Sequence, residues 1–131
     1  MSNFSKYGSF VDVAFAAGAA TSSAVDLRQL LHADGTPDVG ELRLIGFKIP
    51  SGWVAAPLTL LHSLDGGVTY QSMYDATGVE YQMTVVAGSY TLLMPSDLIG
   101  ISNFKLQSGT TSAQVTQPSA VTVRANLRRF E

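Results

Sequence analysis

Histidine and cysteine, which often serve as general base and nucleophile, are scarce in this 131-residue chain, whereas serine and aspartate are abundant. His32 and His62 are its only histidines, and it contains no cysteine. A reactive serine would need a strained turn of the G-x-S-x-G type, which the sequence lacks. Glu41 and Glu80 are the only glutamates before the last residue, and no motif pairs them for glycoside hydrolysis. We therefore expect no catalytic residue, and we expect His62 to lie in the core or at a strand edge.

Motifs for cofactors and metals are also missing. There is no G-x-G-x-x-G string before a helix and no Walker loop. Two polar turns, residues 34–38 and 75–78, carry aspartate but lack the dense, alternating ligands of a calcium loop. We expect neither a cofactor nor a metal ion.

The most distinctive string is Ser63-Leu64-Asp65-Gly66-Gly67-Val68-Thr69-Tyr70. It matches the Asp-box pattern S-x-D-x-G-x-T-aromatic, which is a hairpin device. Its serine and aspartate bind backbone donors of the turn, glycine supplies a positive φ, and the aromatic ring covers the hairpin. The string recurs in sialidase-like propellers, but here it occurs once. We therefore predict a structural turn built on Ser63, Asp65, Gly67 and Thr69.

A second turn and a set of aromatic residues surround this string. Asp75 is expected to start a hairpin turn that Gly78 closes. The single tryptophan, Trp53, is expected either as a core plug or as a ring that stacks on a sugar or a partner. Tyr70 and Tyr74, with Tyr81 on the adjoining strand, fit a cross-strand aromatic cluster.

The elements that position these residues are short apolar runs separated by Gly, Pro, Asp and Ser, which is an all-β pattern. A phase slip at Ile45-Gly46 predicts a β-bulge, and residues 121–127 alternate strictly between apolar and polar side chains. The expected strands are 10–16, 25–30, 41–49, 58–64, 69–74, 79–85, 90–94, 103–108 and 121–127. Residues 23–26 also fit a helical capping box, and residues 95–100 fit one helical turn.

About eight such strands, with at most one or two short helical turns, predict an antiparallel β-sandwich of jelly-roll or Greek-key type. The length suits one domain. We expect residues 1–20 to form an N-terminal arm or the first strand, and residues 21–131 to form the single sandwich domain.

The composition is unusual in its charge. Charged residues make up 14% of the chain, against about 25% in typical proteins. A surface of this kind suits a protein packed against neighbours, or it is simply polar and uncharged. The net charge of −2 gives no reason to expect nucleic acid, and no apolar stretch is long enough to span a membrane. The absence of cysteine favours assembly in the cytoplasm.

Basic residues gather toward the C-terminus as Lys105, Arg124, Arg128 and Arg129, whereas Glu131 is the only acid after residue 100. This imbalance predicts either a basic face that meets an acidic partner or charge pairs formed across a sheet. The candidate partner-contact residues are Trp53, Tyr70, Tyr74, Arg124, Arg128 and Arg129.

From about Ile45 onward, roughly two-thirds of the chain, the sequence resembles small virion proteins of tailed bacteriophages that decorate or cement capsids. The residues that carry the resemblance include Gly46, Ile49-Pro50, Trp53, Leu58-Thr59, Ser63, Asp65-Gly66, Tyr70, Tyr74-Asp75, Gly78, Glu80, Pro95, Leu98, Gly100, Phe104-Lys105-Leu106, Ser108-Gly109-Thr110, Val115 and Gln117.

The resemblance implies a β-sandwich on the outer surface of the capsid, bound to the major capsid protein. It also implies association with itself as a dimer or trimer, because many weak contacts repeated by symmetry hold a shell by avidity. An alternative is a tail- or fibre-associated sandwich that binds host glycan through Trp53 or the hairpin aromatics. A small hydrolase on a jelly-roll scaffold is the third possibility.

Overall fold

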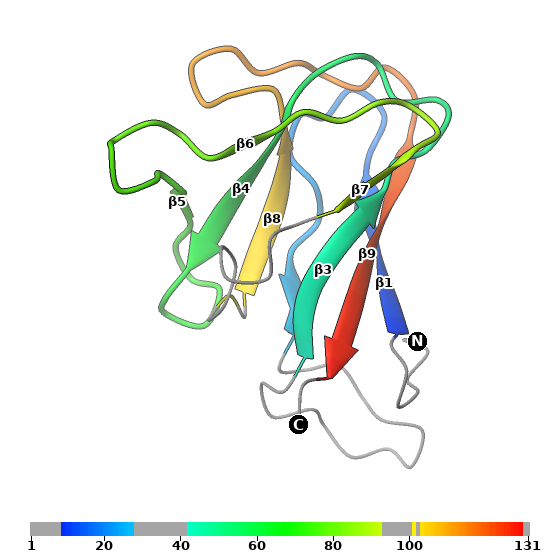
Figure 1. Ribbon diagram of the computed structural model, residues 1–131. Helices are drawn as coiled ribbons and strands as arrows, with labels where there is room; N and C mark the ends of the chain where they lie inside the picture. Colours follow the sequence, from blue (N-terminus) through cyan, green and yellow to red (C-terminus); the bar gives the residue numbers. More distant parts are fainter. Residues whose placement is uncertain (1–8, 28–41, 93–100, 102, 130–131) are drawn as a thin grey trace.

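The computed structural model describes residues 9–27, 42–92, 101 and 103–129, and within them the chain is an all-β sandwich. Two antiparallel sheets face each other (Figure 1). One sheet has the strand order β1-β9-β3-β7, and the other has the order β2-β8-β4-β5, with β6 also paired to β4. The predicted fold class is confirmed.

Nine strands are present in the described part of the chain. Their bounds are β1 Ser9–Phe15, β2 Val25–Asp26, β3 Leu42–Lys48, β4 Leu58–Ser63, β5 Gln71–Ser72, β6 Gln82–Met83, β7 Tyr90–Leu92, β8 Asn103–Ser108 and β9 Val121–Arg129.

The order of the strands is that of a jelly roll. The chain alternates between the sheets from β1 to β4 and again from β6 to β9. β5 and β6 pair with different halves of β4, so together they fill one interrupted edge position. Such wrapping places the first and last strands side by side, and β1 pairs with β9 along its whole length.

The core lies between the sheets, where alternate residues of the long strands meet. Val13 and Phe15 of β1 face it, and so do Val123, Ala125 and Leu127 of β9. The register of β3 shifts between Leu44 and Gly46, which is the predicted bulge, and the shift lets Leu44, Phe47 and Ile49 all point inward.

Several expected strands are shorter in the structure. β5 and β6 have two residues each, because residues 73–81 form a projecting hairpin held by the isolated Tyr74–Glu80 bridge. β4 ends at Ser63, and Leu64, the last residue of the expected strand, is 86% exposed. Val79, the first residue of the expected 79–85 strand, is exposed too. Of the expected 25–30 strand, only Val25–Asp26 is extended; Leu27 is described but lies outside the strand, and residues 28–30 lie outside the described residues. The expected helical turn at 95–100 and residues 1–8 of the expected arm lie outside the described residues.

Candidate functional site

The Asp-box turn between β4 and β5 is held by side chains of its own string. Asp65 Oδ1 accepts hydrogen bonds from the backbone N–H groups of Val68 and Thr69, at 3.1 and 2.9 Å. Asp65 Oδ2 accepts from the Thr69 hydroxyl at 2.5 Å. The Ser63 hydroxyl accepts from the Gly67 N–H at 2.8 Å and donates to Asp65 Oδ1 at 2.7 Å. Ser63, Asp65 and Thr69 therefore fix the path of the loop.

The backbone and the charge of this turn follow from these bonds. Gly66 and Gly67 have φ values of 76° and 94°, which L side chains rarely adopt. The bonds from Thr69 and Ser63 hold the pKa of the Asp65 carboxyl well below its usual range. The turn also displays two aliphatic side chains, since Leu64 and Val68 are 86% and 80% exposed.

The second aspartate turn, on the β5–β6 hairpin, is also held by hydrogen bonds from its own residues to the aspartate. Asp75 Oδ1 accepts from the backbone N–H of Thr77 at 2.8 Å, from its hydroxyl at 2.6 Å and from the Val79 N–H at 3.1 Å. These bonds lower the pKa of Asp75. Gly78 has a φ of 84° and closes the turn. Tyr74 and Val79 flank it and are 57% and 55% exposed.

The aromatic candidates occupy separate environments. Trp53 is 5% exposed and packs edge-to-face against Phe15, with ring centroids 5.3 Å apart. Its ring therefore belongs to the core and offers no stacking surface, which removes it from the candidate partner contacts. The Lys105 ammonium lies over the Tyr70 ring, 4.6 Å from the ring centroid. Tyr81 packs against the core, whereas Tyr74 points outward, so the three tyrosines do not form one cluster.

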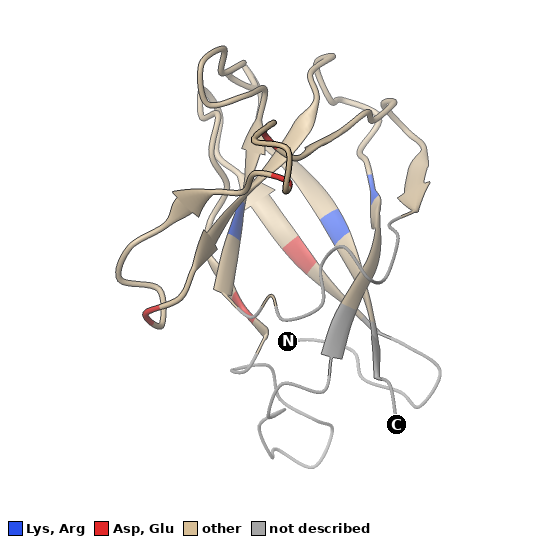
Figure 2. Cartoon of the chain, turned by 60° about the vertical axis from the view of Figure 1, so that its left-hand side comes forward, with Lys and Arg blue, Asp and Glu red and all other residues tan. Residues whose placement is uncertain are grey.

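The basic candidates divide between the two sheets. Lys105 lies on β8, and Arg124 lies on β9, where it is exposed between the buried Val123 and Ala125 and so faces outward. The described Lys and Arg residues are the separate blue segments in Figure 2. Arg124 Nε donates to Asp12 Oδ1 at 2.9 Å from the directly opposite position on β1, and its guanidinium stacks 3.9 Å from the Phe10 ring centroid. Arg128 and Arg129 belong to β9, but their side chains lie outside the described residues.

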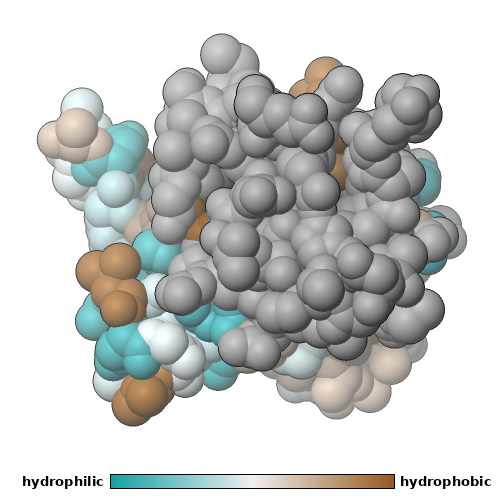
Figure 3. Space-filling view, turned by 90° about the horizontal axis from the view of Figure 1, so that it is seen from below, coloured by the Kyte–Doolittle hydropathy of each residue, from teal (hydrophilic) through white to brown (hydrophobic). Residues whose placement is uncertain are grey.

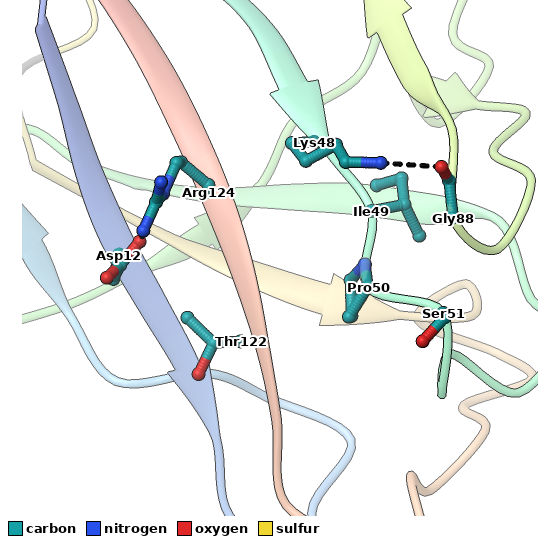
Figure 4. Close-up of a pocket in the computed structure, with 8 residues that line it drawn as sticks. All are labelled: Asp12, Lys48, Ile49, Pro50, Ser51, Gly88, Thr122 and Arg124. Carbon is teal, nitrogen blue, oxygen red and sulfur yellow. Dashed lines mark hydrogen bonds and ion pairs between the residues drawn. The ribbon is translucent and has the colours of Figure 1, made fainter.

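A groove opens on this outer face beside Arg124. Its volume is about 530 Å³, and Figure 4 shows its lining residues. On one side Lys48 Nζ donates to the Gly88 carbonyl at 2.5 Å, and on the other Arg124 reaches Asp12. Sequence reasoning missed Lys48, because it precedes the Ile49-Pro50 turn as an isolated charge and only the sheet register places it next to Arg124.

One end of the outer face of the five-stranded sheet, around Thr59 and Gln107, is covered by the loop of residues 109–117, which sequence reasoning also missed. Thr59 is fully buried, and its hydroxyl donates to the Gly109 carbonyl at 2.8 Å. Gln117 is fully buried as well: its Oε1 accepts from the Val54 N–H at 2.8 Å, and its Nε2 donates to Ser108 Oγ at 2.9 Å and to the Val54 carbonyl at 3.1 Å. These polar residues hold the loop against the sandwich.

The histidines form no catalytic pair within the described residues. His62 is partly buried in β4, its Nε2 has no hydrogen-bond partner, and desolvation lowers its pKa. The expected core or strand-edge position is not confirmed, because His62 is outside the buried core and β4 pairs with β8 on one side and β5 on the other. Its Nε2 also lacks the hydrogen bond usual for a buried polar group. His32 lies outside the described residues. No group of three or more His, Asp or Glu side chains in the described part could hold a metal ion.

Comparisons with family models, with curated proteins and with solved structures find no match to this chain. Within the described residues, no helix is long and apolar enough to cross a bilayer. No function therefore comes to this chain from a relative.

Proposed function

We propose that this chain is a structural protein of a tailed bacteriophage that decorates or cements the capsid by binding the outer surface of the major capsid protein lattice. It does so as a symmetric dimer or trimer, assembled in the host cytoplasm. The proposal joins the resemblance of residues 45–117 to the character of the molecular surface.

One observation carries the proposal: four large apolar side chains are displayed on two internally bonded turns. These side chains are Leu64 and Val68 on the Asp-box turn and Tyr74 and Val79 on the β5–β6 hairpin. Both turns lie at the β5–β6 edge of the five-stranded sheet (Figure 1). Seen from below, brown hydrophobic atoms reach the surface beside the grey region (Figure 3).

Exposed apolar side chains on a fixed scaffold favour binding to another protein. Apolar area contributes about 25 cal/mol per Å² when it is removed from water, and a loop that is already ordered loses less conformational entropy on binding. With only 14% charged residues, the chain has few charges to desolvate at such a contact.

The test is co-sedimentation of the purified chain with naked capsids. We expect the wild-type chain to sediment with them, and we expect a Leu64→Ser/Val68→Ser double variant to bind less. A Val86→Ser variant is the matched control, because Val86 is exposed but lies just before β7 of the other sheet. Failure of the wild-type chain to bind at any salt concentration would overturn the proposal.

The glycan-binding alternative is weakened by the burial of Trp53. Tyr74 remains as an exposed ring on the hairpin. Binding of a host polysaccharide that is lost in a Tyr74→Ser variant, together with failure to bind capsids, would favour that alternative.

A further inference from the structure

Four side chains form a row across the open outer face of the four-stranded sheet. Asp12 of β1 lies opposite Arg124 of β9, Arg124 lies opposite Lys48 of β3, and Lys48 lies opposite Tyr90 of β7. All four are exposed, whereas their sequence neighbours Val13, Val123 and Phe47 point into the core. The register therefore places two cations side by side at the centre of this face.

Two like charges at directly opposed positions of paired strands repel each other. Asp12 supplies one negative charge, which leaves the row with a net charge of +1 in a protein whose net charge is −2. Figure 4 shows the two cations turned apart, Arg124 toward Asp12 and Lys48 toward Gly88. An anion between them would replace this repulsion by attraction to both.

Both cations are held in place by contacts that leave donors free. Arg124 uses its Nε on Asp12, and stacking on Phe10 orients the guanidinium plane. Its two Nη nitrogens have no hydrogen-bond partner among the described residues. The Lys48 ammonium, with three protons to donate, makes one described hydrogen bond, to the Gly88 carbonyl. A planar guanidinium with free Nη groups matches the geometry of a carboxylate.

We propose that this groove binds a carboxylate side chain carried by an extended acidic segment of a partner protein. The groove, at about 530 Å³, falls in the range of sites for organic ligands rather than of sites for one inorganic ion. Ser51 and Thr122 add hydroxyl groups to its lining, and Pro50 adds an apolar wall for the methylene groups of an acidic side chain. The site is separate from the apolar turns and does not rest on the capsid proposal.

The probe is a peptide of four glutamates, capped at both ends, titrated into the full chain at low salt. A matched peptide of four glutamines and inorganic phosphate serve as controls. We expect the amide NMR signals of Ser51, Gly88 and Thr122 to shift when the glutamate peptide is added and to stay unchanged with the glutamine peptide. Phosphate should shift them only at higher concentrations than the glutamate peptide. If phosphate binds as tightly as the peptide, the groove is a small-anion site and the proposal is wrong.

Three variants test whether the row itself binds the carboxylate. Lys48→Gln should weaken binding of the glutamate peptide about threefold to fivefold, as expected for the loss of one exposed ion pair. Asp12→Asn should strengthen it by a similar factor, because the amide oxygen still accepts from Arg124 while the competing charge is gone. Lys105→Gln removes the same charge from the other sheet and should have no effect.

Equal weakening by Lys48→Gln and Lys105→Gln would show attraction to overall charge alone and would overturn the proposal. Absence of any shift at the groove in the wild-type chain would do the same. Because the readout is peptide binding rather than capsid binding, failure here leaves the proposed capsid function to be judged by its own test.

Discussion

The outer faces of the two sheets differ in the solvent exposure of their outward-pointing side chains. On the five-stranded sheet, Thr59 and Gln107 point outward yet are almost completely buried, because residues 109–117 fold over them. On the four-stranded sheet, the outward residues of β1 and β9 around Asp12 and Arg124 remain in contact with solvent. The first face is closed at this end by the chain itself, and no described segment covers the second.

The closing loop shows what it takes to bury polar residues on a sheet. Gly109 has a φ of 87°, and a side chain there would collide with the backbone of Ala113. The Thr111 hydroxyl donates to Glu80 at 2.7 Å, which ties the loop to the β5–β6 hairpin. The polar group that the loop removes from water is the Thr59 hydroxyl, and its bond to the Gly109 carbonyl satisfies it. Among the described residues, no segment folds over the outer face of the four-stranded sheet in this way.

The largest effect on the free energy of unfolding is expected at Gln117, which bonds the end of the 109–117 loop to Val54 and Ser108. A Gln117→Leu variant leaves the Val54 backbone groups and Ser108 Oγ without their bonds. Because an unsatisfied buried polar group costs about 1–3 kcal/mol, we expect a loss of about 2–4 kcal/mol in the free energy of unfolding, measured by urea denaturation. The exposed Gln114 is the matched control, and Gln114→Leu should change stability by less than about 0.5 kcal/mol. Equal losses of stability at the two positions would show that the bonds of Gln117 do not hold the 109–117 loop to the sandwich.

A smaller effect on the free energy of unfolding, which depends on pH, is expected when Asp65 of the Asp-box turn is substituted. The pKa of Asp65 in the folded chain lies below the unperturbed value of 3.8, so its stabilising contribution is present above about pH 4. That contribution is lost as the pH falls toward the folded pKa. An Asp65→Asn variant should be less stable than the wild type at pH 6, and this difference should shrink as the pH falls from 4 to 2. A difference that stays constant over that range would show that the charge of Asp65 is not what holds the turn.

The smallest effect on the free energy of unfolding is expected from the Arg124–Asp12 ion pair on the outer face of the four-stranded sheet. Arg124 and Asp12 are both about half exposed, with side-chain accessibilities of 49%. Exposed pairs of this kind contribute about 0.2–1 kcal/mol. A double-mutant cycle with Arg124→Gln and Asp12→Asn, measured by urea denaturation, should give a coupling energy in that range. A coupling above about 2 kcal/mol would mean that the pair is a structural bond and that this face is not a free surface.

Local patterns in the sequence determined the positions of the long strands and of the aspartate turns, but not the lengths of β5 and β6. β8 spans the predicted residues 103–108, and the bulge after Leu44 was readable from the phase slip at Ile45-Gly46. The bonds of the Asp-box turn join residues at most four positions apart, so Ser63, Asp65 and Thr69 specify their own geometry. Periodicity and short-range hydrogen bonds depend only on neighbours along the chain, and for that reason they could be predicted.

Only the tertiary structure decided which side chains meet. Gln117 bonds to Val54 across 63 positions, and Arg124 bonds to Asp12 across 112. Neither contact leaves a pattern in the sequence, because both arise from the wrapping of the sheets. The same wrapping placed Trp53 against Phe15 in the core and put Lys48 next to Arg124. Side chains distant along the chain become neighbours only through the strand order and register, and no local pattern encodes these.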